Sequence, residues 1–364
     1  MILKLLLKKI SEKFSRDGFS LFVSGPQSFS IYLNKWNFNT LNVISDCDLI
    51  YLAKNFENVD FGKDGYSAVI YLNEIRLNFQ VLPDCDLHKG GYLKKSLPEG
   101  FLNIESFFYI PLKDKFYDPF GVYGSLKNKE LFFVEEKDFW GIKDVLKGIY
   151  FSVEFLFDFK FSNKLDLGGE VDSQVLIYFF KILTSKNPHR GISLMDNYGL
   201  LEKVIPEIAT LKGCPQDKDF HPEGDVFVHT LECFKYLKTK NRVLALSMLL
   251  HDIGKPETIV ASPSLRFPMH AVVGAKMGRK ISKRLGFSDA EVEELMFYIK
   301  NHLLGAIVRN GSMEHLLYIF KSKFFENLLK LYRADILGSL GDLKEYKRVV
   351  KVFDSLKKEC IFFD

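Results

Sequence analysis

Residues 242–257 read RVLALSMLLHDIGKPE, and this stretch decides how the second half of the chain folds. Its first nine residues are mostly apolar and have the length of a buried helix. His251 and Asp252 follow directly, and such polar side chains are costly to bury unless they are paired or bind a metal ion. Gly254 and Pro256 end the helix just after the pair, which predicts that the pair faces a cleft.

Two other apolar helical stretches each contain one side chain of a kind that binds metals. His229 lies in VFVHTLECF, and Asp335 lies in LYRADILGSL. One such residue is more often a satisfied core residue or a helix cap than a ligand, but four together favour a metal site. Imidazole and carboxylate ligands suit Mn, Fe, Co, Zn or Mg, and the sequence does not select among these metals.

The order H…HD…D resembles the HD phosphohydrolase superfamily. The resemblance implies that the metal ligands are His229, His251, Asp252 and Asp335. It also implies that His270 and His302 are extra histidines for a second metal, that Lys255 faces a phosphate, and that Asp252 and Lys255 are catalytic. The implied activity is metal-dependent hydrolysis of a phosphoester in a nucleotide, a cyclic nucleotide or dinucleotide, or an RNA end.

A second resemblance extends over most of the chain. Residues 187–231 resemble the segment that joins the neck to the HD domain in bacterial CCA-adding enzymes and poly(A) polymerases. The residues that carry it are Gly199, Leu200, Leu201, Pro206, Glu207, Gln216, His221, Pro222, His229 and Thr230. Residues 116–131 resemble that family's DPFGG…DLKN segment, and SDCDLI at 45–50 resembles its Asp-x-Asp strand.

This resemblance implies an α+β chain in three parts: a small nucleotidyltransferase-like α/β head at 1–136, a helical neck at 137–217, and a helical HD domain at 218–364. The residue patterns agree with it. Apolar spacing predicts a helix over 1–17, strands over 21–26 and 41–53, and a hairpin of strands 67–72 and 75–82. Apolar residues recur at helical spacing after residue 137.

The head has lost residues that nucleotide addition needs. Asp46 and Asp48 alternate along the expected strand, so with Gly25 they are predicted to bind Mg²⁺ and a nucleotide if the head is active. Pro26, however, removes a backbone donor where phosphates would bind, and neutral Asn78 falls where the family has a third acid. Residues 1–150 contain two arginines. The head is therefore predicted to be degenerate, which ranks hydrolysis first.

Two alternatives stay open. One is a tRNA CCA-adding or poly(A) nucleotidyltransferase with a divergent head. The other is an RNA-binding protein without catalysis, for which the segments 127–130, 181–190 and 275–284 offer basic residues. The expected partners are a phosphorylated nucleotide or an RNA such as tRNA.

The composition excludes few classes of protein. The net charge is +4, from 50 Lys+Arg against 46 Asp+Glu, which does not by itself imply nucleic acid. The five cysteines form no CxxC pair, so a zinc ribbon or a disulfide framework is not expected. No run of 18 apolar residues occurs, and the amphipathic start does not fit a signal peptide. We therefore expect a cytoplasmic protein without a membrane partner.

Overall fold

A computed structural model describes residues 2–36, 38–83, 85–87, 100–161, 164–219, 221–260 and 265–358. The chain forms two compact units, one of residues 1–140 and 157–164 and the other of 141–156 and 165–364. The predicted HD domain and most of the predicted neck lie in the second unit, whereas residues 137–140 and 157–164 of that neck belong to the first. The predicted boundaries at 136 and 217 stay predictions.

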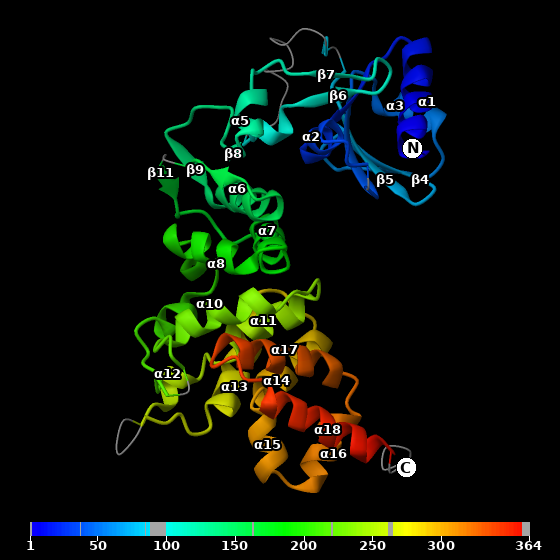
Figure 1. Ribbon diagram of the computed structural model, residues 1–364. Helices are drawn as coiled ribbons and strands as arrows, with labels where there is room; N and C mark the ends of the chain where they lie inside the picture. The colour runs from blue at the N-terminus through cyan, green and yellow to red at the C-terminus, as the bar shows by residue number, and fades with distance from the viewer. Residues whose placement is uncertain are drawn as a thin grey trace. The chain divides into compact units, whose positions relative to one another are not determined.

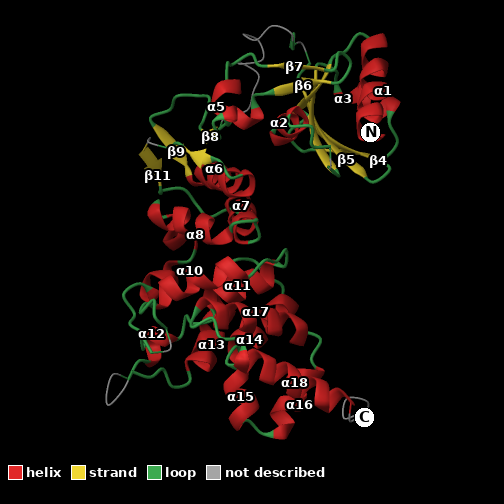
Figure 2. Ribbon diagram, in the orientation of Figure 1, coloured by secondary structure: helices red, strands yellow, loops and turns green. Residues whose placement is uncertain are grey.

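The first unit is built on a mixed seven-stranded sheet in the order β3-β4-β5-β2-β1-β6-β7 (Figures 1 and 2). Its strands are β1 (Leu21–Ser24), β2 (Thr40–Ser45), β3 (Val59–Phe61), β4 (Ser67–Leu72), β5 (Ile75–Val81), β6 (Phe108–Ile110) and β7 (Lys115–Tyr117). The helices of this unit are α1 (Ile2–Arg16), α2 (Pro26–Tyr32), α3 (Leu49–Asn55), the 3-10 turn η1 (Asn103–Glu105) and α5 (Tyr123–Lys127). Short strands follow at β8 (Glu130–Leu131), β9 (Phe139–Gly141), β10 (Asp158–Phe159) and β11 (Lys164–Asp166).

Helix α1 covers one face of this sheet. Its residues Leu3, Leu7, Ile10 and Phe14 recur every three or four positions, so they form one apolar stripe, and all four are buried in the core of the unit. Phe14 stacks on Phe79 of β5 with ring centroids 5.9 Å apart. The predicted helix and the predicted hairpin are thus both present, the hairpin as β4 and β5.

The strand predicted over 41–53 is wrong in its second half. Strand β2 ends at Ser45, and helix α3 begins at Leu49. Asp48 is the N-cap of α3, where its side chain accepts a hydrogen bond from Tyr51 N at 2.6 Å. An aspartate that can satisfy the first free N–H groups of a helix favours a helix start over a continuing strand.

The second unit is helical. Its neck part contains α6 (Ile142–Phe155), α7 (Ser173–Leu183), α8 (Pro188–Asn197), α9 (Leu200–Val204) and η2 (Pro206–Leu211). The helices that follow are α10 (Val226–Tyr236), α11 (Arg242–Leu250), α12 (Lys255–Thr258), α13 (His270–Arg284), α14 (Asp289–Asn301), α15 (Leu304–Asn310), α16 (Met313–Lys321), α17 (Phe325–Gly338) and α18 (Lys344–Lys358). The predicted α+β class, with a mixed head and helices after it, is confirmed.

Glycines allow the closest helix approaches in the second unit. A Cβ on Gly338 of α17 would lie 2.7 Å from Cys233 Sγ and 2.8 Å from Cys233 N on α10. A Cβ on Gly254 would lie 2.3 Å from His270 O at the start of α13. Larger side chains would push these helices apart, so Gly338 sets how closely α17 approaches α10, and Gly254 sets how closely α13 approaches the turn after α11. The helices are labelled in Figure 1.

Among the described residues, none of the helices has the length and the apolar character needed to cross a membrane.

Replacing Gly338 with alanine is expected to lower the free energy of unfolding by about 1–3 kcal/mol, because the new methyl group overlaps the backbone of α10. Thermal unfolding followed by circular dichroism measures the change. Gly124→Ala is the control, because a Cβ there meets no atom within 4 Å and alanine favours a helix. Equal melting temperatures for Gly338→Ala and the parent chain would contradict the close approach.

Candidate functional site

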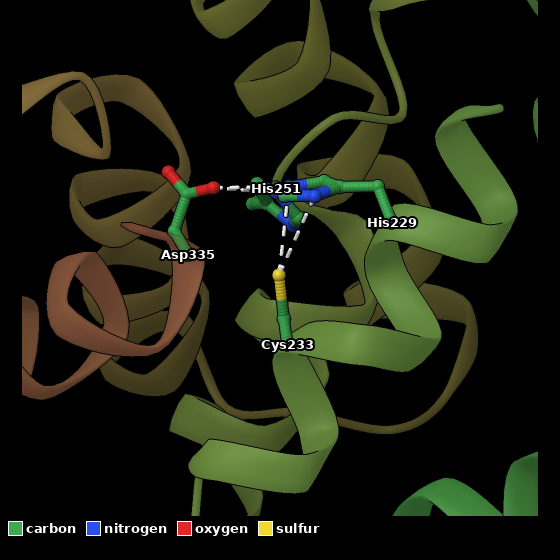
Figure 3. Close-up of side chains that lie close together, drawn as sticks. All are labelled: His229, Cys233, His251 and Asp335. Atoms are coloured by element: carbon green, nitrogen blue, oxygen red, sulfur yellow. Dashed lines mark hydrogen bonds and ion pairs between the residues drawn. The ribbon is translucent and has the colours of Figure 1, made fainter. Parts of the chain in front are cut away.

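The four ligands predicted from the sequence converge at one place in the second unit. His229 Nε2 lies 3.0 Å from Asp335 Oδ1 and 3.4 Å from His251 Nε2. His251 Nε2 lies 3.3 Å from Asp252 Oδ2. Figure 3 shows the rings of His229 and His251 between Asp335 on one side and helix α10 on the other.

The two further histidines form a second group around the same aspartate. Asp252 Oδ1 lies 3.5 Å from His270 Nε2 and 3.5 Å from His302 Nε2. The two Nε2 atoms are 3.3 Å apart. Asp252 therefore turns one carboxylate oxygen towards each group, which is the position of a bridging ligand.

The Nδ1 atoms fix how the rings point. In three of the histidines, Nδ1–H donates to the carbonyl oxygen three residues earlier, at 2.7–2.8 Å. These bonds join His251 to Met248, His270 to Phe267, and His302 to Ile299. In His229, Nδ1 lies 2.8 Å from Glu223 Oε1. With Nδ1 engaged, each Nε2 is directed into the site, as in histidines that bind metals.

The facing Nε2 atoms and the buried Asp252 carboxylate are stabilised by positive charge between them. Two facing Nε2 lone pairs repel one another unless a proton or a metal ion lies between them. Asp252 Oδ1 is buried and accepts no hydrogen bond of normal geometry from the described residues. Ligand atoms around a tetrahedral ion with bonds of 2.0–2.2 Å are separated by about 3.3–3.6 Å. The separations within the cluster run from 3.0 Å for His229–Asp335 to 4.0 Å for His229–Asp252, and those of His229–His251, His270–His302 and His251–Asp252, at 3.3–3.4 Å, fit that geometry.

The pKa shifts of His229 and Asp252 also reflect the close packing of charged groups in the cluster. Burial alone would lower the pKa of His229, but the Cys233 thiol and the carboxylates of Asp335 and Glu223 together raise it well above its usual value. Burial would raise the pKa of Asp252, yet Lys255 and His251 hold it well below the usual range. Buried carboxylates that stay ionised among imidazoles attract a cation.

Lys255 contacts the cluster and also lines a cavity beside it. Its ammonium is buried, lies 2.7 Å from Asp252 Oδ2 and donates to Gln216 Oε1. It also lines an open cavity of about 410 Å³ beside Asp252, His270 and His302. Its first partner is thus a carboxylate of the cluster, and any role towards a phosphate stays a prediction.

Three residues of the cluster were not predicted as ligands. Cys233 Sγ lies 3.4 Å from His229 Nε2, and Figure 3 shows its side chain pointing at the two rings. Glu223 orients His229, and His221 Nδ1 lies 3.1 Å from Glu223 Oε1. Signals for them exist in the sequence, since Cys233 follows His229 by one helical turn and Glu223 closes the turn before α10.

In the head, the predicted nucleotide residues do not come together. Strand β1 runs antiparallel to β2, with Leu21 opposite Ser45 and Ser24 opposite Asn42. Gly25 therefore lies near the start of β2, whereas Asp46 and Asp48 follow its end. Four residues of strand span about 13 Å. Asp46 Oδ1 instead accepts a hydrogen bond from Ser20 N at 2.6 Å. The expectation that both acids alternate on the strand is wrong.

Amide side chains, not carboxylates, lie on β2 and β5 near Gly25. Asn42 and Asn78 are partners in the parallel pair β2–β5, and Asn78 Nδ2 donates to Asn42 Oδ1 at 3.0 Å. Arg76 Nε donates to Asn78 Oδ1 at 2.9 Å. A Cβ on Gly25 would lie 3.1 Å from Asn42 Nδ2. This hydrogen-bonded chain has no carboxylate, the ligand that Mg²⁺ prefers.

Two family models match the chain, both in the second unit. The model described as the probable RNA and SrmB-binding site of polymerase A matches residues 175–212. The HD domain model matches residues 226–358, which contain the whole histidine cluster except His221 and Glu223.

The curated proteins that are similar to this chain include CCA proteins and a tRNA nucleotidyltransferase. The Multifunctional CCA protein of Neisseria meningitidis serogroup A is 30% identical over 218 residues, which cover 53% of this chain and 50% of that protein. The chain is homologous to such proteins over about half of its length. The A-adding tRNA nucleotidyltransferase of Deinococcus radiodurans is 29% identical over 167 residues, covering 44% of this chain and 38% of that protein. The chain spans about half the length of the curated relatives it matches.

Solved structures of CCA-adding enzymes share the fold. The Bacillus stearothermophilus CCA-adding enzyme in complex with CTP gives a TM-score of 0.61 at 12% identity, over 96% of this chain and 82% of that one. The Thermotoga maritima CCA-adding enzyme complexed with tRNA gives 0.57 at 13% identity, over 96% and 81%. At these identities the likeness shows the fold alone.

These comparisons overturn the phosphohydrolase interpretation of the sequence. The predicted relationship to CCA-adding enzymes is confirmed, and the relatives and structural neighbours are named for nucleotide addition to tRNA rather than for phosphoester hydrolysis. The order of the HD motif residues predicted an HD domain, but the presence of that domain does not by itself establish phosphoester hydrolysis.

Asp252→Ala is expected to weaken divalent metal binding by at least about tenfold, because the variant loses the carboxylate that both histidine groups face. Metal content after equilibrium dialysis, measured by mass spectrometry, tests this. Asp289→Ala is the matched control, since the Asp289 side chain is 88% exposed and lies on α14 of the same unit. Equal metal content in the Asp252 variant and the control would count against a metal centre.

Proposed function

We propose that the chain acts at the 3′ end of tRNA as a nucleotidyltransferase of the CCA-adding type. The observation that carries the proposal is the 30% identity over 218 residues to a Multifunctional CCA protein. The match of residues 175–212 to an RNA-binding region supports RNA as the partner. The proposed substrates are tRNA and nucleoside triphosphates, the molecules named with the structural neighbours.

A group of basic residues offers a surface for the tRNA backbone. Lys238 Nζ donates to Lys186 O at 3.0 Å, and Lys240 Nζ donates to Thr184 O at 2.9 Å, so both ammonium groups are held over the end of α7. Burial lowers the pKa of the nearby His189, and the charges of Lys238, Lys235 and Arg190 lower it further. We call Lys186, Arg190, Lys235, Lys238 and Lys240 the neck cations.

Acidic residues neutralise only part of the charge of the neck cations, which leaves positive charge for RNA phosphates. Glu154 and Glu232 neutralise part of the charge, through Lys186 at 2.9 Å and Lys235 at 2.6 Å. The side chains of Lys238 and Lys240 form no ion pair with a described acid. Converging cations on one face supply the sequence-independent part of RNA binding.

The histidine cluster is proposed to hold a divalent metal ion. The proposed ligands are His229, His251, Asp252 and Asp335, with His270 and His302 towards a second ion. The ion would supply the positive charge that the facing Nε2 atoms and the buried Asp252 oxygen need. Because it would join side chains from α10, α11 and α17, it would also hold these helices together.

A second candidate function is tRNA binding without nucleotide addition. It is favoured by the head, where Gly25 faces the amides of Asn42 and Asn78 while Asp46 and Asp48 lie at the other end of β2. Nucleotide addition needs carboxylates for Mg²⁺ beside the site that holds the triphosphate. The two candidates share the partner and differ in the reaction.

Incorporation of labelled CTP and ATP into tRNA that lacks its CCA end decides between them. The first candidate predicts incorporation by the parent chain with Mg²⁺ and none when Mg²⁺ is removed with a chelator. Tight tRNA binding without incorporation by the parent chain would reject the first candidate and support the second.

Charge reversal of Lys238 and Lys240 to glutamate is expected to weaken tRNA binding at least about tenfold and to reduce the salt slope by about one for each phosphate that the variant no longer neutralises. Filter binding or fluorescence anisotropy at several salt concentrations measures both quantities. The control reverses Lys351 and Lys357, two exposed lysines of α18. If both double variants bind tRNA equally well, the neck cations are not the RNA surface.

A further inference from the structure

We propose that Cys233 is a thiolate ligand of the metal ion in the histidine cluster, and that this ligand makes the site select zinc-like metals over Mg²⁺. The proposal rests on the metal centre proposed above and adds a residue and a metal class to it. It assigns a role to a buried cysteine that neither the sequence pattern nor the similarity to CCA-adding enzymes had marked.

The position of Cys233 supports this role first. Cys233 follows His229 by four residues on α10, so both side chains point to the same face of the helix. Its Sγ lies 3.4 Å from His229 Nε2, and the ligand atoms of His229, Cys233, His251 and Asp335 all lie within 4.8 Å of one another. A thiolate at 2.3 Å and an imidazole nitrogen at 2.0–2.1 Å from a tetrahedral zinc ion are separated by about 3.6 Å. The observed spacing fits.

A second observation is independent of the cysteine. Asp252 is 2% exposed, and its Oδ1 accepts no hydrogen bond of normal geometry within the described part of the chain. Its other oxygen, Oδ2, lies 3.3 Å from His251 Nε2 and 4.0 Å from His229 Nε2. Oδ2 thus faces the same two imidazoles as the thiol and also pairs with Lys255, while the unsatisfied Oδ1 faces His270 and His302. Buried ionised ligand-type groups that converge in this way indicate a cation site rather than a chance cluster of core residues.

Packing alone explains only the size of residue 233. Gly338 comes so close that a Cβ on it would lie 3.0 Å from Cys233 Cα, and a small side chain is therefore needed on α10 at this crossing. Alanine would satisfy that need. It would not place a polarisable sulfur against the Nε2 atoms of the site, which is what Figure 3 shows.

The chemistry of binding is simple. The thiol loses its proton to solvent as the sulfur forms a bond to the metal ion, so binding releases one proton at this ligand. The resulting set of two imidazoles, two carboxylates and one thiolate favours Zn²⁺ or its surrogate Co²⁺, whereas Mg²⁺ prefers oxygen ligands. The thiolate therefore narrows the choice among metals that the sequence left open.

Cobalt spectroscopy of the full chain tests the proposal. The protein is stripped with a chelator, loaded with Co²⁺, and examined for the sulfur-to-cobalt charge-transfer band in the near ultraviolet. The parent chain should show the band and retain Zn²⁺ over excess Mg²⁺. Cys233→Ser and Cys233→Ala should lose the band and bind Zn²⁺ at least about tenfold more weakly. Cys214→Ser is the control, because Cys214 is buried in the same unit outside the cluster.

Each outcome has a distinct meaning. Stoichiometric Co²⁺ binding by the parent chain without the band, or a band that persists in Cys233→Ala, would overturn the thiolate ligand and leave the metal centre. Failure of the folded parent chain to bind Co²⁺ or Zn²⁺ would overturn both. The spectrum of the parent chain decides the matter even if a cysteine variant does not fold.

Discussion

Four imidazole rings that turn their Nε2 atoms towards one buried aspartate form the constraint on which the second unit depends. Their Nδ1 atoms are engaged, three by carbonyl oxygens of the preceding turn and one by Glu223. The rings come from α10 and α13 and from the ends of α11 and α14, and α17 adds Asp335. Such a cluster is costly to bury without a counter-charge, so five helices must be placed accurately for it to exist.

The positions of these five helices account for two glycines, a buried lysine and a cysteine that lie far apart in the sequence. Gly338 allows α17 to approach α10 at Cys233, and Gly254 allows α13 to approach the turn that follows α11. Lys255 is buried because it supplies a positive charge beside Asp252. The same crossing of α10 and α17 that brings Asp335 to His229 also requires a small residue at position 233, and cysteine meets both requirements there.

The head and the helical unit differ in what they have kept. The helical unit brings four histidines and two aspartates together and presents the neck cations. The head keeps the sheet of a CCA-adding enzyme, but its edge near Gly25 has a hydrogen-bonded chain of Arg76, Asn78 and Asn42. The head therefore holds amides rather than carboxylates beside Gly25, which is why RNA binding and nucleotide addition are tested separately for this chain.

The sequence by itself determined much of this protein. Periodic apolar residues predicted α1, the β4–β5 hairpin and the helices after residue 137, since local spacing alone decides which face is buried. Ordered motifs identified the family and the residues of the histidine cluster. Tertiary structure decided the rest. Asp46 and Asp48 look like a strand motif, yet a helix cap and strand order separate them from Gly25, and Cys233 joins the cluster only through helix crossing. Both outcomes depend on contacts between distant segments, which residue spacing does not specify.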